Sequence, residues 1–168
     1  MPSGVERARP FWVIMAVTVG LDRASKVIAD RMLPGRPVHL LGDIVQLRLV
    51  HNQGAAFGLE LGAWQRWIFL VIAIVAIAWL RSASRQASPT DVLRQYAVGF
   101  VAGGAAGNAV DRMLSSRGVV DFIDVGIGTM RWPTFNVADI AVTCGAVALA
   151  ISLWREDARH APTPAPAD

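Results

Sequence analysis

The sequence predicts an all-α membrane protein with four transmembrane helices and a small extramembrane β-containing region. The chain has 168 residues, of which 54% are hydrophobic and only 17% charged. A soluble domain of this length cannot bury that much apolar surface. Four apolar stretches also approach the ~20 residues that the hydrocarbon core of a bilayer requires. They cover about residues 11–29, 64–80, 92–110 and 137–154, within one membrane-embedded domain predicted for residues 1–160.

The first apolar stretch is predicted to be a retained helix. It follows Arg7 and Arg9, as a cleavable signal peptide would, but it runs into Asp22 and Lys26. No small-residue cleavage site follows it, which argues against removal. Tryptophans lie near the ends of the four stretches, where an amphipathic ring suits the membrane interface. They are Trp12, Trp64, Trp67, Trp79 and Trp154.

The segments between the stretches differ in character. Residues 37–58 carry β-branched and leucine side chains that partly alternate with polar ones, most clearly at 45–49. This pattern predicts short strands, and so a small extramembrane sheet between the first two helices. The link "RSASRQASPT" at 81–90 is short and polar, as expected of a plain connector. Residues 161–168, which are rich in Pro and Ala, are predicted to form a disordered tail.

Composition argues against several kinds of partner and cofactor. The net charge of +3 comes from 16 Lys and Arg against 13 Asp and Glu. These charges are spread along the chain rather than gathered in a basic stripe, so no nucleic-acid partner is expected. Cys144 is the single cysteine and is interpreted as a small core residue. The three histidines are too scattered for a zinc site, and no metal or other cofactor is expected.

The predicted topology places unusual polar residues on one side of the membrane. With four spans, the termini and the 81–91 link share one side, and the 30–63 loop lies on the other. Ionisable groups near a bilayer are costly, which makes them candidates for function. The residues on the side of the 30–63 loop are Asp22, Lys26, Asn52, Asn108, Asp111, Arg112, Asp121, Asp124, Asn136 and Asp139.

Some of these residues also have purely structural interpretations. Asp22 and Lys26 are spaced i,i+4 with the acid first, which suits an ordinary helical ion pair. "NQGAAF" at 52–57 has the composition of a turn. "FNVAD" places Asn136 as a helix N-cap and Asp139 three residues later, a variant of the capping box. Helix initiation alone would account for both residues.

A glycine repeat in the third stretch is interpreted as a packing surface. Gly99, Gly103 and Gly107 recur every four residues and form a stripe of small residues, which lets helices approach closely. The neighbouring "GGAAGN" is not a phosphate-binding loop, because no Gly-Lys-Ser/Thr follows.

Five short motifs carry a family resemblance when they are taken together. "DRASK", "NQGAAF", "GGAAGNAVDR", "VVDF" and "FNVAD" occur in this order over about residues 11–155. The chain thereby resembles the signal peptidase II family of bacterial membrane aspartyl peptidases. The resemblance implies that Asp121 of "VVDF" and Asp139 of "FNVAD" are the catalytic pair. It implies substrate-binding or supporting roles for Asp22, Lys26, Asn52, Asn108, Asp111, Arg112 and Asn136.

Two carboxylates fit the chemistry that the resemblance implies. Amide hydrolysis without a Ser, Cys or metal nucleophile needs one ionised carboxylate to deprotonate water and one protonated partner to polarise the carbonyl. Asp139, beside a helix N-terminus, is the choice for the ionised acid, and Asp121 for the protonated one. Asn108, Asn136 and Arg112 would orient the acids and the substrate or stabilise the oxyanion. Chemistry alone does not choose between Asp121 and the nearby Asp124.

The resemblance also implies a substrate and a location. The substrate is a prolipoprotein with a diacylglyceryl group on the cysteine after its signal peptide, cut on the N-terminal side of that cysteine. The lipid bilayer is the other expected partner, and the protein is expected to function as a monomer. The family places the site at the outer face of the bacterial inner membrane and both termini in the cytoplasm. The charge count opposes this orientation, because the side with the termini carries seven of the 16 Lys and Arg.

Two other functional classes remain open on the residues alone. A small transporter or proton channel also gathers ionisable residues in a membrane, but it should show internal repeats or a polar path to the opposite face. The second and fourth stretches lack such a path. A metal hydrolase is the other alternative, because carboxylates suit Mg²⁺. Its ligands would be Asp111, Asp121, Asp124 and Asp139.

Overall fold

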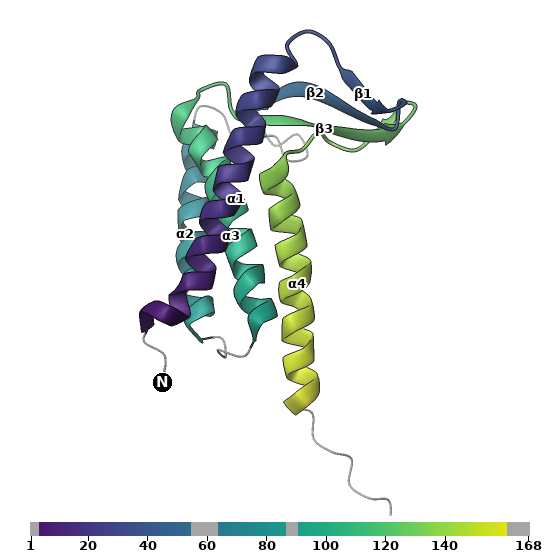
Figure 1. The fold of residues 1–168 in the computed structure, drawn as a ribbon. Coiled ribbons are helices and arrows are strands. Elements are labelled where there is room, and N and C mark those ends of the chain that lie inside the picture. Colours follow the sequence, from purple (N-terminus) through teal and green to yellow (C-terminus); the bar gives the residue numbers. More distant parts are fainter. Residues whose placement is uncertain (1–3, 55–63, 87–90, 161–168) are drawn as a thin grey trace, which may run out of the picture.

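The computed structural model describes residues 4–54, 64–86 and 91–160, and in this part of the chain it has four helices (Figure 1). The helices are α1 (Gly4–Met32), α2 (Gln65–Gln86), α3 (Val92–Leu114) and α4 (Val137–His160). Each contains one of the predicted apolar stretches almost completely. The predicted tail at 161–168 and residues 55–57 of "NQGAAF" lie outside the described residues.

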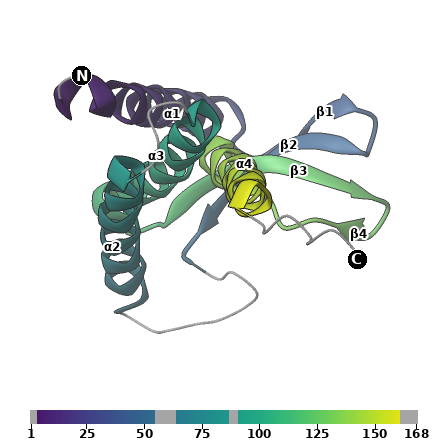
Figure 2. The same cartoon turned by 90° about the horizontal axis from the view of Figure 1, so that it is seen from below.

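Helix α3 is the centre of the helical part, because it packs against all three other helices (Figure 2). The predicted glycine stripe lies on its contact with α1. A Cβ atom built on Gly103 would lie 2.6 Å from Cβ of Thr18, and one on Gly107 would lie 2.5 Å from Oδ2 of Asp22. The interpretation of the stripe as a packing surface is confirmed, because only glycine leaves room for α1 at this distance.

The outer faces of the helices are apolar while charged side chains lie inside. Helices α2, over Gln65–Arg85, and α4, over Val137–Ala158, are long and apolar enough to cross a membrane. Their outward-facing residues include Val75 and Val147, each more than half exposed. Asp22 and Lys26 of α1, in contrast, are almost fully buried. This distribution is the reverse of that expected for a helix bundle in water.

A four-stranded antiparallel sheet lies at one end of the helices (Figure 1). Its strands are β1 (Val38–Leu41), β2 (Val45–Asn52), β3 (Val119–Ile127) and β4 (Met130–Arg131), paired in sequence order. The sequence interpretation was therefore incomplete, because it placed the sheet wholly between the first two helices. Half of its strands come from the link between α3 and α4. The burial of β3 explains the omission: Val119 to Phe122 are all buried, which hides the alternation of a half-exposed strand.

The sheet is fixed to the helices by a small apolar cluster. Ala29 and Leu33, at the end of α1, pack with Val120 and Phe122 of β3. Helices α1 and α3 end at the sheet and α4 begins there, so three helix ends and the sheet meet (Figure 1). The polar residues that the topology placed on one side of the membrane lie at this junction.

Candidate active site

Asn136 joins the two predicted catalytic acids. It precedes α4, and its side-chain Nδ2 donates to Oδ1 of Asp121 on β3 over 2.7 Å. Its backbone N donates to Oδ2 of Asp139 in the first turn of α4 over 3.1 Å. Asp121 and Asp139 are 18 residues apart in the sequence, yet one residue holds both carboxylates.

The predicted capping box is present. The backbone N of Asp139 donates to Oδ1 of Asn136 over 2.9 Å, and Asp139 returns the bond to the backbone N of Asn136. These reciprocal bonds satisfy two donors at the helix start, as in a capping box. Helix initiation does not account for all contacts of Asn136, because its Nδ2 also reaches Asp121 and Asn108 Oδ1, the latter over 3.1 Å.

Each acid has a further asparagine partner from another element. Asn52, at the end of β2, donates from Nδ2 to Oδ2 of Asp121 over 3.0 Å. Its Oδ1 accepts from the backbone N of Gly54, which fixes the orientation of its amide. Asn108 of α3 donates from Nδ2 to Oδ1 of Asp139 over 2.9 Å. Both oxygens of each acid thus accept a hydrogen bond.

The pairing of β2 with β3 brings Asn52 to Asp121, and Gly118 permits the close approach of the two strands. Asn52 pairs with Val119 at the start of β3, just after Gly118. Gly118 has φ +100°, and a Cβ atom there would collide with the backbone carbonyl of Asn52. A residue with a side chain would therefore push the end of β2 away from the acid.

Lys26 is the centre of a buried charge network next to the two acids. Its Nζ lies 2.8 Å from Oδ2 of Asp22 and 2.9 Å from Oδ2 of Asp111, and it donates to Oδ1 of Asn108 over 2.8 Å. Its side chain is 0% exposed. The pair of Asp22 and Lys26 is thus buried and shared with a second acid, which distinguishes it from an isolated surface bridge. Through Asn108 the network reaches Asp139.

The acids of this network also fix neighbouring backbone. Asp22 accepts from the backbone N of Ala138 over 2.9 Å, which ties α1 to the start of α4. Asp111 accepts from the backbone N of Val120 over 3.2 Å and pairs with Arg23 at 3.2 Å. Arg23 of "DRASK" is not among the predicted site residues, because only the tertiary packing of α1 on α3 brings it to Asp111.

The sequence suggests Arg112, the next residue along the chain, as a partner of Asp111, but the structure does not pair the two. Arg112 donates from Nη1 to the backbone O of Asn108 over 3.1 Å, and its guanidinium lies over the ring of Phe69 on α2, 5.1 Å from the centroid. Successive residues of a helix point about 100° apart, so Asp111 faces α1 while Arg112 faces α2. Hydrogen bonds through Asn108 therefore link Arg112 to Asp139, and the charges of Asp139, Asp121 and Asp111 act on its guanidinium from farther away.

Asp124 forms ion pairs with two arginines outside the predicted catalytic pair. Its carboxylate is 2% exposed and pairs with Nε of Arg131 at 2.7 Å and with Nε of Arg48 at 3.4 Å. The four acids of the metal hypothesis are thus split: Asp124 pairs with arginines, Asp111 pairs with Lys26 and Arg23, and only Asp121 and Asp139 share a partner. In the described part of the chain, no three His, Cys, Asp or Glu side chains are grouped to hold a metal ion.

Burial makes the two acids unequal. Asp121 is only 2% exposed. This burial raises the pKa of its carboxyl group from 3.8 to about 6. The hydrogen bond from Asn52 opposes the shift, and the negative charge of Asp139 adds to it. Asp139 is only partly buried. Asp121 therefore holds a proton at a higher pH than an ordinary aspartate does.

Asp139 lines a pocket of about 320 Å³ on the outer side of α4. The other lining residues are mostly apolar and include Trp132, Phe135 and Ile140. Cys144 also lines this pocket and is exposed, so its interpretation as a core residue was wrong. The pocket gives an apolar molecule access to one of the two acids.

The sequence and the fold are similar to those of known bacterial membrane proteins. Residues 14–155 match the family model described as "Signal peptidase (SPase) II". A lipoprotein signal peptidase of Rhodococcus jostii is 41% identical over 157 residues, which cover 89% of this chain and 75% of that protein. One of Hydrogenovibrio crunogenus is 40% identical over 156 residues, which cover 89% and 87%.

Two solved structures share the fold. Both are bacterial membrane enzymes determined by the in meso method, at 2.3 Å and 1.9 Å resolution. The first has a TM-score of 0.79 and 27% identity, and the match covers 92% of this chain and 93% of that one. The second has a TM-score of 0.74 and 30% identity, with coverage of 85% and 91%.

Proposed function

The chain belongs to the signal peptidase II family, and we propose that it is an aspartic endopeptidase of diacylglyceryl-modified prolipoproteins. Family membership itself supports a membrane protease that cleaves the signal peptides of lipoproteins. The proposal adds the catalytic pair Asp121 and Asp139, and a cut on the N-terminal side of the lipidated cysteine. The observation that carries it is the pair of hydrogen bonds by which Asn136 holds both acids.

The environments of the two acids support different roles. Asp121 is buried and has a raised pKa, so it is the general acid that donates a hydrogen bond to the scissile carbonyl. Asp139 accepts two N–H groups, from Asn108 and from the backbone of Asn136, and it lies beside the positive end of α4. Both features favour a carboxylate, so Asp139 is the general base.

The reaction then follows from these roles. Asp139 takes a proton from water, whose oxygen attacks the scissile carbonyl carbon while Asp121 transfers its proton to the carbonyl oxygen. The resulting tetrahedral intermediate collapses when Asp139 gives its proton to the leaving amide nitrogen and the C–N bond breaks. Asp121 recovers its proton from the intermediate's hydroxyl as the carbonyl re-forms. The pair ends as it began, with one proton shared between two acids.

The remaining site residues would support this pair. Asn52, Asn108 and Asn136 orient the carboxylates by the hydrogen bonds already described. Lys26, which pairs with Asp22 and Asp111, donates to Oδ1 of Asn108 and so fixes the orientation of this amide. Arg112 lends positive potential to the oxyanion from its position next to Asn108. No metal or other cofactor enters the proposed reaction.

We further infer that all four helices cross the bacterial inner membrane as one domain of residues 1–160. Among the described helices, α1 and α3 do not meet the measure of apolar length that α2 and α4 meet, because they carry polar residues of the charge network, among them Asp22, Lys26 and Asp111. Trp12, Trp79 and Trp154 are exposed at the end away from the sheet, as in an aromatic belt. By family likeness, the sheet and the site face the periplasm, both termini are cytoplasmic, and the protein acts as a monomer.

The proposed substrate suits this location. The pocket beside Asp139 is apolar, and it lies on α4, one of the two helices apolar enough to span a membrane. A signal helix and acyl chains can reach it from the bilayer without entering water. Buried acyl chains contribute ~0.8 kcal/mol per CH₂ group, which is enough to hold the scissile bond at the membrane face.

Cleavage by the purified protein tests the proposal. A prolipoprotein is offered with and without its diacylglyceryl group, and mass spectrometry identifies the product. We expect cleavage immediately before the modified cysteine, and a much slower reaction of the unmodified precursor. Equal rates for the two precursors in matched detergent would contradict the lipid requirement. A product that begins at another residue would contradict the proposed cut site.

A further inference from the structure

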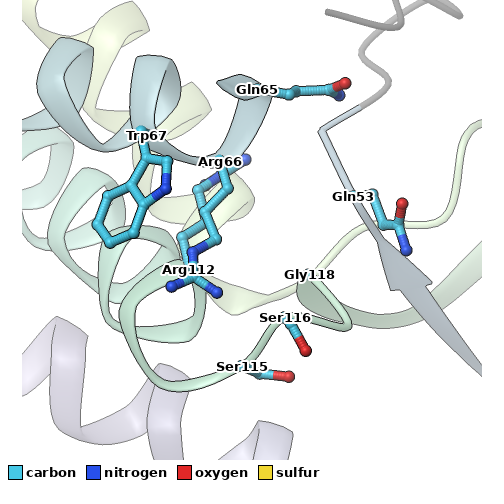
Figure 3. A pocket seen from close by; sticks show the side chains of 8 residues that line it. All are labelled: Gln53, Gln65, Arg66, Trp67, Arg112, Ser115, Ser116 and Gly118. Carbon is cyan, nitrogen blue, oxygen red and sulfur yellow. The ribbon is translucent and has the colours of Figure 1, made fainter. Parts of the chain in front are cut away.

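A polar pocket of about 410 Å³ lies between the start of α2, the end of α3 and the end of β2 (Figure 3). Two arginines line it, Arg66 from the first turn of α2 and Arg112 from the last turn of α3. Figure 3 shows both guanidinium groups on the same side of the pocket, with Ser115 and Ser116 below them. The volume lies within the range of pockets that hold small ligands.

Arg66 has no charged partner among the residues that the structure describes. Within the described residues it forms no ion pair or hydrogen bond, and its recorded contact is with the ring of Trp67, 4.6 Å from the centroid. Arg112 likewise forms no close ion pair there, although the charges of Asp139, Asp121 and Asp111 act on it from farther away. Its Nε is buried and lacks a hydrogen-bond partner, as does that of Arg66. Two guanidinium groups that border one cavity with donors to spare form an attractive site for an anion.

We propose that this pocket binds the phosphate of an anionic phospholipid headgroup. Guanidinium groups offer paired N–H donors that match phosphate oxygens, and the two serine hydroxyls add further donors. Trp67 is about half exposed beside Arg66, and this pairing of an interfacial aromatic ring with a cation suits the headgroup level of a membrane. The first turn of α2 also directs its positive helix end to this side.

The lining favours a headgroup with net negative charge. Among the described residues, those that line the pocket include two arginines and no acid. An ethanolamine headgroup would bring an ammonium group next to these guanidinium groups without a carboxylate to receive it. A glycerol headgroup carries no such charge, and its hydroxyls can bond Gln53 or the serines. Phosphatidylglycerol should therefore bind more tightly than phosphatidylethanolamine.

This inference rests on the proposed crossing of the membrane by α2 but not on the proposed proteolysis. Binding of short-chain phosphatidylglycerol to the purified full chain is measured in a non-ionic detergent, with no peptide substrate. Failure of the lipid site and failure of the peptidase function are thereby separate results. Phosphatidylethanolamine of the same chain length and inorganic phosphate are titrated in parallel.

Arg66→Gln is the test variant and Arg85→Gln the matched control. Both remove one positive charge from α2, but Arg85 is exposed at the other end of the helix. We expect phosphatidylglycerol to bind Arg66→Gln about 10-fold more weakly, as for the loss of one charge-assisted hydrogen bond, and to bind Arg85→Gln as it binds the unaltered protein. Arg66→Lys, which keeps the charge, should retain part of the affinity.

Three results would overturn the proposal. Equal affinity of Arg66→Gln and Arg85→Gln would show that Arg66 does not contact the lipid. Equal affinity for phosphatidylglycerol and phosphatidylethanolamine would show that the net charge of the headgroup does not determine binding. Inorganic phosphate that binds as tightly as the lipid would make a free anion, not a headgroup, the occupant. Thermal unfolding of each variant verifies that a loss of affinity is not a loss of fold.

Discussion

Asn136 Nδ2 lies 2.7 Å from Asp121 Oδ1 and thereby joins the start of α4 to the third strand of the sheet. Asn136 is 0% exposed, and its other polar atoms hold Asp139 in a capping box. The same residue thus starts a helix and aligns the proposed catalytic pair. We expect its capping bonds to affect stability and its bond to Asp121 to affect activity.

Asn136→Ala should lose both properties. Removal of the N-cap costs about 0.5–2 kcal/mol of stability. Cleavage should fall by a larger factor, about 100-fold or more, because Asp121 loses the amide donor that orients it and the backbone N of Asp139 loses its capping oxygen. Asn136→Ser keeps a capping oxygen but cannot reach Asp121 as the amide does. A well-folded Asn136→Ser protein with near-normal turnover would show that the bond to Asp121 has no catalytic importance.

Asp121→Asn and Asp139→Asn should each abolish cleavage in a folded protein. The change keeps the size of the side chain but removes the base and the titratable proton. Because the pair acts as a unit, the double variant should be hardly slower than either single variant. Turnover is compared with thermal stability for each protein.

Asp124→Asn is the matched control for these variants. Asp124 lies on the same strand as Asp121 and is equally buried, but its partners are Arg131 and Arg48. It should retain substantial cleavage, although the loss of its ion pairs lowers stability. An inactive Asp124→Asn protein beside an active Asp121→Asn protein would move the proposed pair to Asp124 and Asp139.

Cleavage should fall above about pH 6. The proposed general acid Asp121 has its pKa raised to about 6 by burial, so its protonated fraction decreases as pH rises past that value. At sufficiently low pH no ionised carboxylate remains in the pair to act as the base, and the rate falls again. The measurement is kcat/KM against pH under conditions in which the protein stays folded. A rate that still increases above pH 7 would contradict the assignment of Asp121 as the acid.

The same pKa predicts an effect on stability. Native Asp121 binds a proton up to about pH 6, whereas the unfolded chain releases it near 3.8. The contribution of this group is therefore fully present below pH 3.8 and is lost as pH rises through 6, by at most about 3 kcal/mol. Asp121→Asn should lose less stability than the unaltered protein between pH 4 and 7. The free energy of unfolding is measured for both proteins over that range. The same dependence on pH in both would contradict the raised pKa of Asp121.

Lys26→Met should destabilise the protein by about 3–5 kcal/mol, because it leaves Asp22 and Asp111 buried without their shared cation. Arg23→Gln is the control. Its side chain is 46% exposed and pairs with the same Asp111, so its loss should cost no more than about 1 kcal/mol. Similar unfolding temperatures for the two variants would show that burial of Lys26 does not set the strength of the network.

Chelation should leave cleavage unchanged. The proposed reaction uses two carboxylates with amide partners and requires no metal ion. The rate is measured with and without EDTA in the same detergent and lipid. A loss of activity that a divalent cation restores would replace the two-acid mechanism by a metal-assisted one.

The sequence by itself determined the four helices, their apolar stretches and the small residues at the contact of α3 with α1. These features depend on local composition and periodicity, which a single stretch of chain carries. The capping box of Asn136 and Asp139 and the pair of Asp22 with Lys26 were equally predictable, because each lies within one turn of helix. The resemblance of five ordered motifs added the family, and with it the hypothesis of a peptidase.

Only the tertiary structure decided which polar residues share a partner. Asp121 and Asp124 are three residues apart on β3, so the alternation of the strand directs them to opposite faces. Only the packing of each face decides that one acid meets Asn136 and the other meets Arg131. The pairing of β3 with β2 likewise brings Asn52 to Asp121 across 69 residues. Such contacts form between elements that are far apart in the sequence. No short segment therefore contains the information needed to predict them. For the same reason, the shared pocket of Arg66 and Arg112 could be recognised only where α2 meets α3.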